Sequence, residues 1–349
     1  MIPAFRRAAP GAGTLRTGTG FAPCHHGEVL QGVFLDGGVP RPGLVTLPMA
    51  GPGSRAAFVP RPGTAPDAVT VSPAGRSKAT RAAVLAVTEC ARTAGLPPCG
   101  GELRLTGDVP VGLGMGSSTS DVLAALRAVA DAYAVRMTPG TAARLAVLAE
   151  KASDPLMLDD ARPVLFAQRE GRVLEVLGPA LPPLLVVGCA LGGGSPVDTL
   201  SLPAAEVGDS EVRAWERLRG LLRRAVATGD AALVGEVATA SARRGQLVLG
   251  HPEFDDLCAI ARRAGAVGVQ IAHSGAVAGV LFDPWVPDLR TRVRRCVHDL
   301  QADGIPTTRT FTTTPAVTVK ELLDGPAHRR GDRPAGPDPA RRPARVPAL

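Results

Sequence analysis

The sequence feature that most constrains this chain is a glycine-rich stretch directly before a helix-forming segment. Residues 110–119 read PVGLGMGSST, with glycine at every second position from 112 to 116. Each glycine costs about 0.5–1 kcal/mol more to order than alanine, so the stretch suits a backbone that approaches a partner closely or needs positive φ. Residues 117–119 are of types that commonly begin helices, and apolar residues recur at helical spacing from Val122 to Tyr133.

A loop of this kind brings unpaired N–H groups and the positive end of a helix dipole to one point. It is typical of an anion site, and phosphate is the commonest biological anion to fill one. A tight strand–helix turn is the alternative. The stretch is not the P-loop pattern, which needs a lysine where Ser117 or Ser118 stands, and its glycines have the wrong spacing for the dinucleotide-binding fingerprint.

Length and composition indicate two domains that have no membrane span. The chain has 349 residues, of which 45% are hydrophobic, enough for a sizeable core. It has no apolar run of the 18 or so residues that a membrane helix needs, and the first 20 residues lack the apolar stretch of a signal peptide. The six cysteines form no CxxC or short Cys/His cluster, which favours reduced, buried thiols and a cytoplasmic protein.

The net charge of +7 does not indicate nucleic-acid binding, because it comes from the two ends of the chain. Residues 1–17 contain three arginines and no acidic residue, and residues 325–349 contain six arginines and two aspartates. Both tails are rich in Pro, Gly, Ala and Arg, so we expect them to be disordered. With 3% aromatic residues the chain also offers little surface for base stacking.

Between the tails the pattern predicts two mixed α/β halves that meet near residues 170–183. The first half has short strands, a helix over 77–95, a strand, the glycine loop with its helix, and a helix that Thr138 and Pro139 begin. The second half starts with an apolar strand near 184, continues with two or three helices between 210 and 265 and a strand pair, and ends with a helix near 287–303 and a strand over 315–319. We predict domains at 18–178 and 179–324.

Three motifs in a fixed order resemble the GHMP family of small-molecule kinases. Residues 110–119 are similar to the family's nucleotide loop, residues 23–32 (PCHHGEVLQG) to its N-terminal Gly-Glu motif, and residues 271–281 (IAHSGAVAGVL) to its third motif. Within the family the chain looks most like L-threonine kinases, which share the Gly114–Asp121 loop, a Gly-Gly-x-x-Val-Asp-Thr stretch at 193–199 and an Ala-His-Ser-Gly stretch at 272–275. The resemblance covers about residues 19–320.

The resemblance implies an α+β, two-domain fold. The N-terminal, nucleotide-binding domain would be like domain 2 of ribosomal protein S5, the C-terminal domain ferredoxin-like, and the site would lie between them. It also implies ATP and Mg²⁺ as cofactors and transfer of the γ-phosphoryl group to a hydroxyl. Such a transfer needs in-line positioning and neutralisation of negative charge more than covalent help from the protein.

The resemblance also assigns roles to individual residues. Nucleotide contacts fall on Pro110, Gly112, Gly114, Met115, Gly116, Ser117, Ser118 and Thr119. Lys78, at the start of a predicted helix, is a further expected nucleotide contact, with a solvated surface lysine as the alternative. Ser118 and Glu150 are the expected magnesium ligands, a hydroxyl and a carboxylate of the kind Mg²⁺ takes. Asp154 is the expected base, but the chain has one residue more before it than similar kinases, so Asp159 or Asp160 stays an alternative.

Substrate contacts are expected from residues in the other motifs. They are Glu28, His26, Asp198, His273, Ser274 and Gly275. His25 and His26 stand where similar kinases have small residues and a cysteine, and we expect a structural role for His25. Glu150 as an ordinary surface glutamate, Asp154 as a turn residue before proline and His273 as a support of its glycine turn are the alternatives. Gln246 is expected near the cleft.

Together these observations predict an ATP-dependent kinase of a small hydroxy amino acid, with L-threonine as the substrate. A kinase of homoserine or of an intermediate of specialised metabolism is one alternative, and a catalytically silent nucleotide-binding sensor is another. The sequence leaves the oligomeric state open, with a homodimer as one alternative.

Overall fold

The fold consists of one large mixed sheet with helices packed against it. The structure is a computed structural model that describes residues 15–107, 115–158, 162–192, 208–272 and 276–324. The strands of this part of the chain are β1 (Gly18–Asp36), β2 (Val39–Pro60), β3 (Val69–Ser72), β4 (Gly101–Gly107), β5 (Val164–Ala167), β6 (Arg172–Val176), β7 (Leu185–Ala190), β8 (Gly268–Ile271), β9 (Val277–Phe282) and β10 (Thr307–Thr312). Its helices are α1 (Ser77–Ala94), α2 (Ser117–Ala132), α3 (Pro139–Glu150), α4 (Asp209–Thr228), α5 (Ala231–Leu249), α6 (Phe254–Arg263), α7 (Leu289–Ala302) and α8 (Val319–Asp324).

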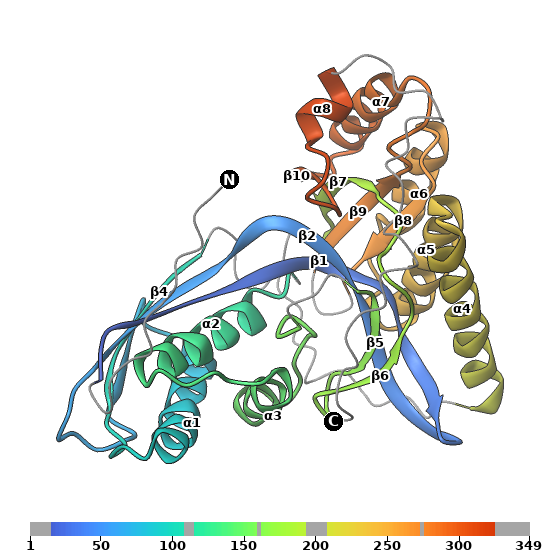
Figure 1. The fold of residues 1–349 in the computed structure, drawn as a ribbon. Helices are drawn as coiled ribbons and strands as arrows, with labels where there is room; N and C mark the ends of the chain where they lie inside the picture. Colours follow the sequence, from blue (N-terminus) through green and yellow to red (C-terminus); the bar gives the residue numbers. More distant parts are fainter. Residues whose placement is uncertain (1–14, 108–114, 159–161, 193–207, 273–275, 325–349) are drawn as a thin grey trace, which may run out of the picture.

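The strands of both halves of the chain belong to the same sheet. Their order is β10-β7-β9-β8-β1-β2-β4-β3, and β5 and β6 branch from β2. The long strands β1 and β2 form an antiparallel ribbon that runs across the molecule (Figure 1). The two halves join where β1 pairs with β8 through Glu28 and Ile271. Glu28 therefore lies at the junction of the halves.

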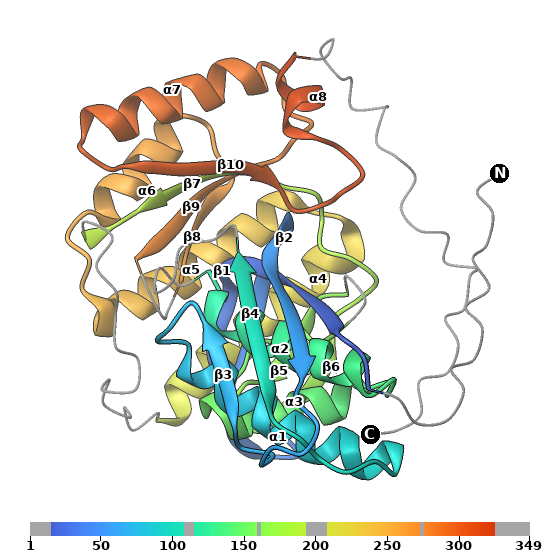
Figure 2. The ribbon, with the colours of Figure 1, turned by 90° about the vertical axis from the view of Figure 1, so that its left-hand side faces the viewer.

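Helices cover the sheet in three groups, each with its own core. Helices α1, α2 and α3 lie together against the ribbon, and their apolar faces form one core with β4 (Figure 1). Helices α4 and α5 pack on the other end of the ribbon, while α6, α7 and α8 cover the strands of the C-terminal half (Figures 1 and 2). The α+β, two-domain fold is therefore confirmed, and the predicted boundary at 178/179 falls in the connection between β6 and β7.

Helix α2 lies unusually close to β1, and two glycines make the approach feasible. A Cβ atom on Gly18 would lie 2.2 Å from the carbonyl oxygen of Ala128, and one on Gly20 would lie 2.2 Å from that of Ala124. Real Cβ atoms do not come this close to backbone, so any side chain at these positions would push α2 away from the sheet. The depth of α2 in the fold thus depends on glycine in β1.

The predicted helices agree with the structure, but one predicted strand is wrong. Residues 315–319 are not a strand; β10 lies earlier, at Thr307–Thr312, and α8 begins at Val319. The reason is a capping box, in which the Thr318 hydroxyl accepts from the Glu321 N–H at 3.2 Å and the Glu321 carboxylate accepts from the Thr318 N–H at 2.7 Å. This local pattern starts a helix where the apolar residues alone indicate a strand.

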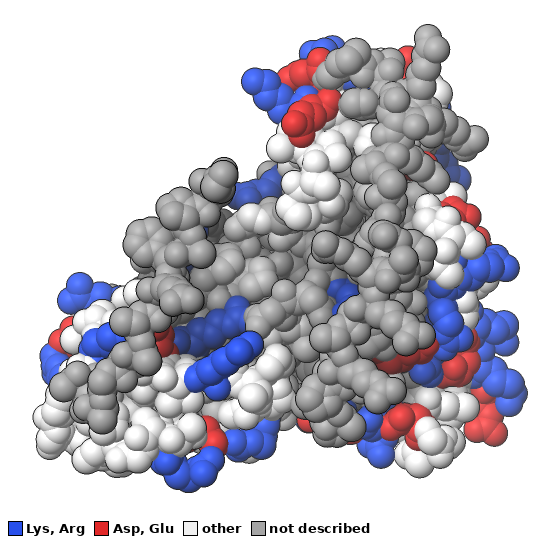
Figure 3. All heavy atoms as spheres, viewed as in Figure 1, with Lys and Arg blue, Asp and Glu red and all other residues white. Residues whose placement is uncertain are grey.

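The surface of the described residues carries mixed charge. On the face that Figure 3 shows, basic and acidic side chains lie side by side over α4. Two of its arginines, Arg219 and Arg223, bind Glu175 at 2.6 and 2.7 Å. The described helices include none that is long and apolar enough to cross a membrane. The predicted tails fall almost entirely outside the described residues.

Candidate active site

The first turn of α2 is built around Gly116. This residue is the N-cap, with φ of +65°, and it has no side chain that could cap the free N–H groups of the turn. A Cβ atom at Gly116 would lie 2.3 Å from Cδ2 of His25, so the imidazole ring packs directly on the glycine backbone. The carbonyl of Met115 accepts from the backbone N–H of His25 at 3.4 Å. The helix start is thereby fixed against β1, and its N-cap residue gives the N–H groups of the first turn no side-chain hydrogen bond, as at helix starts that bind anions.

The hydroxyls of this first turn meet the carboxylate of Glu150. Ser118 Oγ lies 3.1 Å from Glu150 Oε2, and Thr119 Oγ1 lies 2.9 Å from Glu150 Oε1. Glu150 is the last residue of α3, whose start is fixed as predicted, with Thr138 accepting from the N–H of Thr141. Residues 118 and 150 thus come together although 32 positions separate them.

Glu150 is a buried carboxylate with an altered proton affinity. Burial, and then the charge of Asp154, raise the pKa of Glu150 to about 7. The two hydroxyls and the charge of Lys78, an exposed residue in the first turn of α1, act in the opposite direction without cancelling the shift. A buried carboxylate beside a serine hydroxyl is an oxygen donor set of the kind that Mg²⁺ prefers, so these residues fit that ion.

Asp154 lies next to this pair and contacts His25. His25 Nε2 lies 3.0 Å from Asp154 Oδ2, and the ring's Nδ1 lies 3.1 Å from the carbonyl oxygen of Gly27, to which it donates. Burial alone lowers the pKa of His25, but the charge of Asp154, their hydrogen bond and the charge of Glu28 outweigh it and raise the pKa to about 9. Burial alone would raise the pKa of Asp154, and the charge and hydrogen bond of His25 hold it below its usual range instead. The two side chains therefore form an ion pair at neutral pH.

Thr119 connects the two carboxylates. Its Oγ1 lies 2.9 Å from Glu150 and 3.3 Å from Asp154 Oδ2. A hydroxyl has one proton, so it donates to one carboxylate at a time, and the shorter distance favours Glu150. His25 and Thr119 both use Oδ2 of Asp154. The aspartate side chain keeps 22% of its surface exposed, whereas that of His25 keeps 1%.

Irregularities in β1 direct these side chains to one point. The pairing of β1 with β2 shifts register between Pro23 and His25, again before Glu28, and again before Leu30. Such bulges change which way successive side chains of a strand point. As a result His25 and Glu28 both approach Asp154, and the three side chains each offer one donor atom within 4.8 Å of the others.

His26 points away from this group. It is fully buried, its Nδ1 lies 3.1 Å from Gln270 Oε1, and its ring lies 4.9 Å from that of Phe311. Burial, the leading cause, lowers the pKa of His26 to about 4, so the ring is neutral. Its predicted contact with the substrate remains untested, and this packing gives the contact no support.

Several predicted site residues lie outside the described part of the chain. They are Pro110, Gly112, Gly114, Asp159, Asp160, Asp198, His273, Ser274 and Gly275. Ser117 is described and buried in the first turn of α2. Gln246, near the end of α5, accepts from the backbone N–H of His251 at 2.9 Å. The described residues therefore test the proximity of the hydroxyls and carboxylates but not the role of any one residue.

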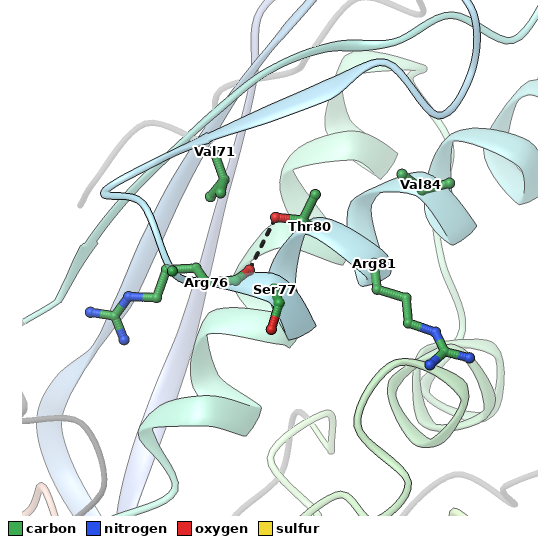
Figure 4. Close-up of a pocket in the computed structure, with 7 residues that line it drawn as sticks. Val71, Arg76, Ser77, Thr80, Arg81 and Val84 are labelled. Atoms are coloured by element: carbon green, nitrogen blue, oxygen red, sulfur yellow. Dashed lines mark hydrogen bonds between the residues drawn. The ribbon is translucent and has the colours of Figure 1, made fainter.

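A surface pocket of about 480 Å³ lies at the N-terminal end of α1. Val71 of β3 and Val84 of α1 form its apolar lining, and Thr80 donates to the carbonyl of Arg76 at 3.1 Å (Figure 4). The side chain of Arg76 binds Asp121 in α2 at 3.1 Å. This ion pair places the pocket beside the first turns of α2.

The position of His25 is a finding of the structure. A structural role is the expectation for this residue, and the structure places its ring on Gly116, with the carboxylates of Asp154 and Glu28 nearby. A signal existed, because a histidine stands where similar kinases have a small residue. The sequence does not indicate that His25 contacts Asp154, which lies 129 positions away.

The raised pKa of His25 predicts a loss of stability at alkaline pH. Protonated His25 stabilises the fold fully below pH 6.5, and this contribution is lost between pH 6.5 and about 9, because the unfolded state releases the proton first. A shift of this size corresponds to about 3 kcal/mol. Urea unfolding at pH 6 and pH 9.5 should show that the free energy of unfolding of the wild type falls between these two pH values. The fall should be clearly smaller in His25→Gln. Equal falls in both proteins would contradict the ion pair.

Comparison with known protein families identifies the class of protein that has this fold. The chain belongs to the GHMP kinase family: the profile described as GHMP kinases N terminal domain matches residues 79–167, and that described as GHMP kinases C terminal matches residues 222–299. The first match spans α1 to β5 and therefore contains Ser118, Glu150 and Asp154.

Two L-threonine kinases are similar to this chain in sequence. The chain is 29% identical to the L-threonine kinase of Citrobacter freundii over 180 residues, which are 50% of this chain and 60% of that protein. It is 28% identical to the L-threonine kinase of Salmonella typhimurium over 182 residues, 50% of this chain and 57% of that one. The match thus spans less than two thirds of either relative.

Solved structures resemble the chain along most of its length. Homoserine kinase from Cytophaga hutchinsonii superposes with a TM-score of 0.63 at 18% identity, over 89% of this chain and 98% of that one. Mevalonate kinase of L. major, solved in complex with R-mevalonate, gives 0.55 at 15% identity over 87% and 97%. At these identities the likeness concerns the fold alone.

Proposed function

We propose that the protein is an ATP- and Mg²⁺-dependent kinase that transfers the γ-phosphoryl group to the side-chain hydroxyl of L-threonine. The observation that carries the proposal is the meeting of Ser118, Glu150 and Asp154 at the first turn of α2. Family membership supports the reaction class, and the two L-threonine kinases that match half of the chain support the substrate.

In this proposal the first turn of α2 binds the phosphates of the nucleotide. Its N–H groups and helix dipole attract anions, and Gly116 lets the backbone come close. Ser118 and Glu150 hold Mg²⁺, which neutralises phosphate charge when bound. The pocket between Val71 and Val84 lies beside the first turns of α2 and offers an apolar surface to the adenine ring of the nucleotide.

Asp154 would accept the proton of the acceptor hydroxyl. His25 holds its Oδ2, which leaves Oδ1 for the acceptor hydroxyl. A low pKa makes Asp154 a weak base for a free alcohol. Proton transfer then takes place as the oxygen bonds to phosphorus and becomes acidic, which fits a loose transition state. His25 keeps the carboxylate ionised and oriented.

A panel of acceptors tests the substrate. ADP release should be measured with MgATP and L-threonine, L-serine, L-homoserine or mevalonate, each against a reaction without acceptor. L-Threonine should give the highest kcat/KM. Turnover with L-homoserine and none with L-threonine would identify L-homoserine as the substrate instead. ATP binding without turnover on any acceptor would favour the nucleotide-binding sensor.

Removal of the magnesium ligands should change the requirement for the ion. In Ser118→Ala and Glu150→Gln we expect the Mg²⁺ concentration for half-maximal rate to rise about tenfold or more, because the first variant loses the hydroxyl ligand and the second loses the negative charge of the carboxylate ligand. ADP release titrated with Mg²⁺ at fixed ATP measures it. Glu236→Gln, at an exposed position of α5, is the matched control. An unchanged Mg²⁺ requirement in Glu150→Gln would rule out Glu150 as the ligand.

A further inference from the structure

His25, Glu28 and Asp154 form a second group of potential metal ligands. One donor atom of each lies within 4.8 Å of the others, and His25 and Glu28 are almost fully buried. The proposed kinase mechanism uses Asp154 and His25 as a base and its partner and gives Glu28 no part in holding an ion.

The orientation of His25 is that of a metal-binding histidine. Its Nδ1 donates to the carbonyl oxygen of Gly27, which leaves Nε2 as the ligand atom, directed at Asp154. A ligating imidazole usually makes this outer contact, because it fixes both the tautomer and the ring. The turn requires glycine at residue 27, since its φ is +67° and a Cβ there would lie 2.2 Å from the Gln270 amide nitrogen.

The donor set differs from that of Ser118 and Glu150. One imidazole nitrogen with two carboxylates balances the charge of a divalent cation and suits zinc, cobalt or manganese, whereas a hydroxyl and a carboxylate suit magnesium. Thr119 stands between the two groups, with Glu150 on one side at 2.9 Å and Asp154 on the other at 3.3 Å. The groups are therefore neighbours with different metal preferences.

We propose that His25, Glu28 and Asp154 bind a divalent transition-metal ion of the zinc class, at a site separate from that of Mg²⁺. The ion displaces the Nε2 proton of His25, which leaves to solvent, and binds this nitrogen together with the carboxylates of Glu28 and Asp154. Asp154 then no longer accepts the proton of the acceptor hydroxyl. Zinc at this site consequently inhibits the kinase, and additional MgATP does not relieve the inhibition.

Cobalt(II) reports on the site without any turnover. Metal-free protein, without nucleotide, should be titrated with Co²⁺ while its visible d–d absorption is followed. We expect one ion per chain, and affinity about tenfold weaker or worse in His25→Gln and in Glu28→Gln. Glu150→Gln and His298→Asn should bind as the wild type does, because the first alters the Mg²⁺ group and the second an exposed histidine of α7.

Several results would overturn the proposal. They are the absence of Co²⁺ binding, Co²⁺ affinity in the His25 and Glu28 variants equal to that of the wild type, and an intense sulfur-to-cobalt charge-transfer band. Such a band would place the ion on cysteine. Should either variant fail to fold, wild-type crystals soaked in Zn²⁺ decide the matter, since an anomalous peak must lie among the three side chains. A peak elsewhere contradicts the site.

The kinase and metal proposals fail separately. ADP release with Mg²⁺ alone tests the first, and Co²⁺ titration without nucleotide tests the second. If the kinase is active, micromolar Zn²⁺ should lower its rate at saturating MgATP, and Glu28→Gln should reduce this inhibition. Inhibition that MgATP abolishes would place zinc at the nucleotide instead and contradict the inference.

Discussion

Asp154→Asn should lower kcat by about 10²–10³-fold and leave nucleotide affinity within about threefold of the wild type. Asparagine keeps the shape of the side chain and a contact with His25, but it cannot accept a proton, and general-base assistance is commonly worth 10²–10⁴-fold. The measurement is ADP release at saturating MgATP and L-threonine, with nucleotide affinity from calorimetry.

The control for this variant is Asp255→Asn, which changes an aspartate of α6 whose side chain is 84% exposed and should keep the full rate. A kcat within a few-fold of the wild type in Asp154→Asn would reject Asp154 as the base. The next candidates would then be Asp159 and Asp160, and parallel variants of these two residues would show whether either carries the role.

Gly20→Ala should destabilise the protein by about 2–4 kcal/mol, a large effect for one methyl group. The added Cβ would lie 2.2 Å from the carbonyl oxygen of Ala124 and 2.6 Å from the backbone nitrogen of Ala128, so α2 has to move. Since α2 carries Ser118 and Thr119, kinase activity should fall as well. Urea unfolding followed by circular dichroism gives the free energy.

The same substitution in α4 should have the opposite sign. A Cβ at Gly220 meets nothing within 4 Å, and alanine favours a helix over glycine, so Gly220→Ala should raise stability by about 0.5–1 kcal/mol. Equal effects at the two positions would show that Gly20 is not required by the close approach of α2 to β1.

Local patterns predicted much of the fold. Thr138 and Pro139 were expected to begin a helix, and the Thr138 side chain does cap α3. The failed strand at 315–319 shows the limit of apolar patterning, because the capping box of Thr318 and Glu321 decides that segment. The pairing of Ser118 with Glu150 came from the resemblance to a family rather than from periodicity, and the structure brings the two within hydrogen-bond distance.

The sequence by itself determined the glycine loop, the helix that follows it and the family, because these depend on residues that are neighbours in the chain. Only the tertiary structure decided that His25 pairs with Asp154 and that Glu28 joins them. The irregular pairing of β1 and the glycine-dependent depth of α2 set those contacts. Both depend on how segments that are distant in the chain pack together, and this packing cannot be predicted from the local spacing of residues.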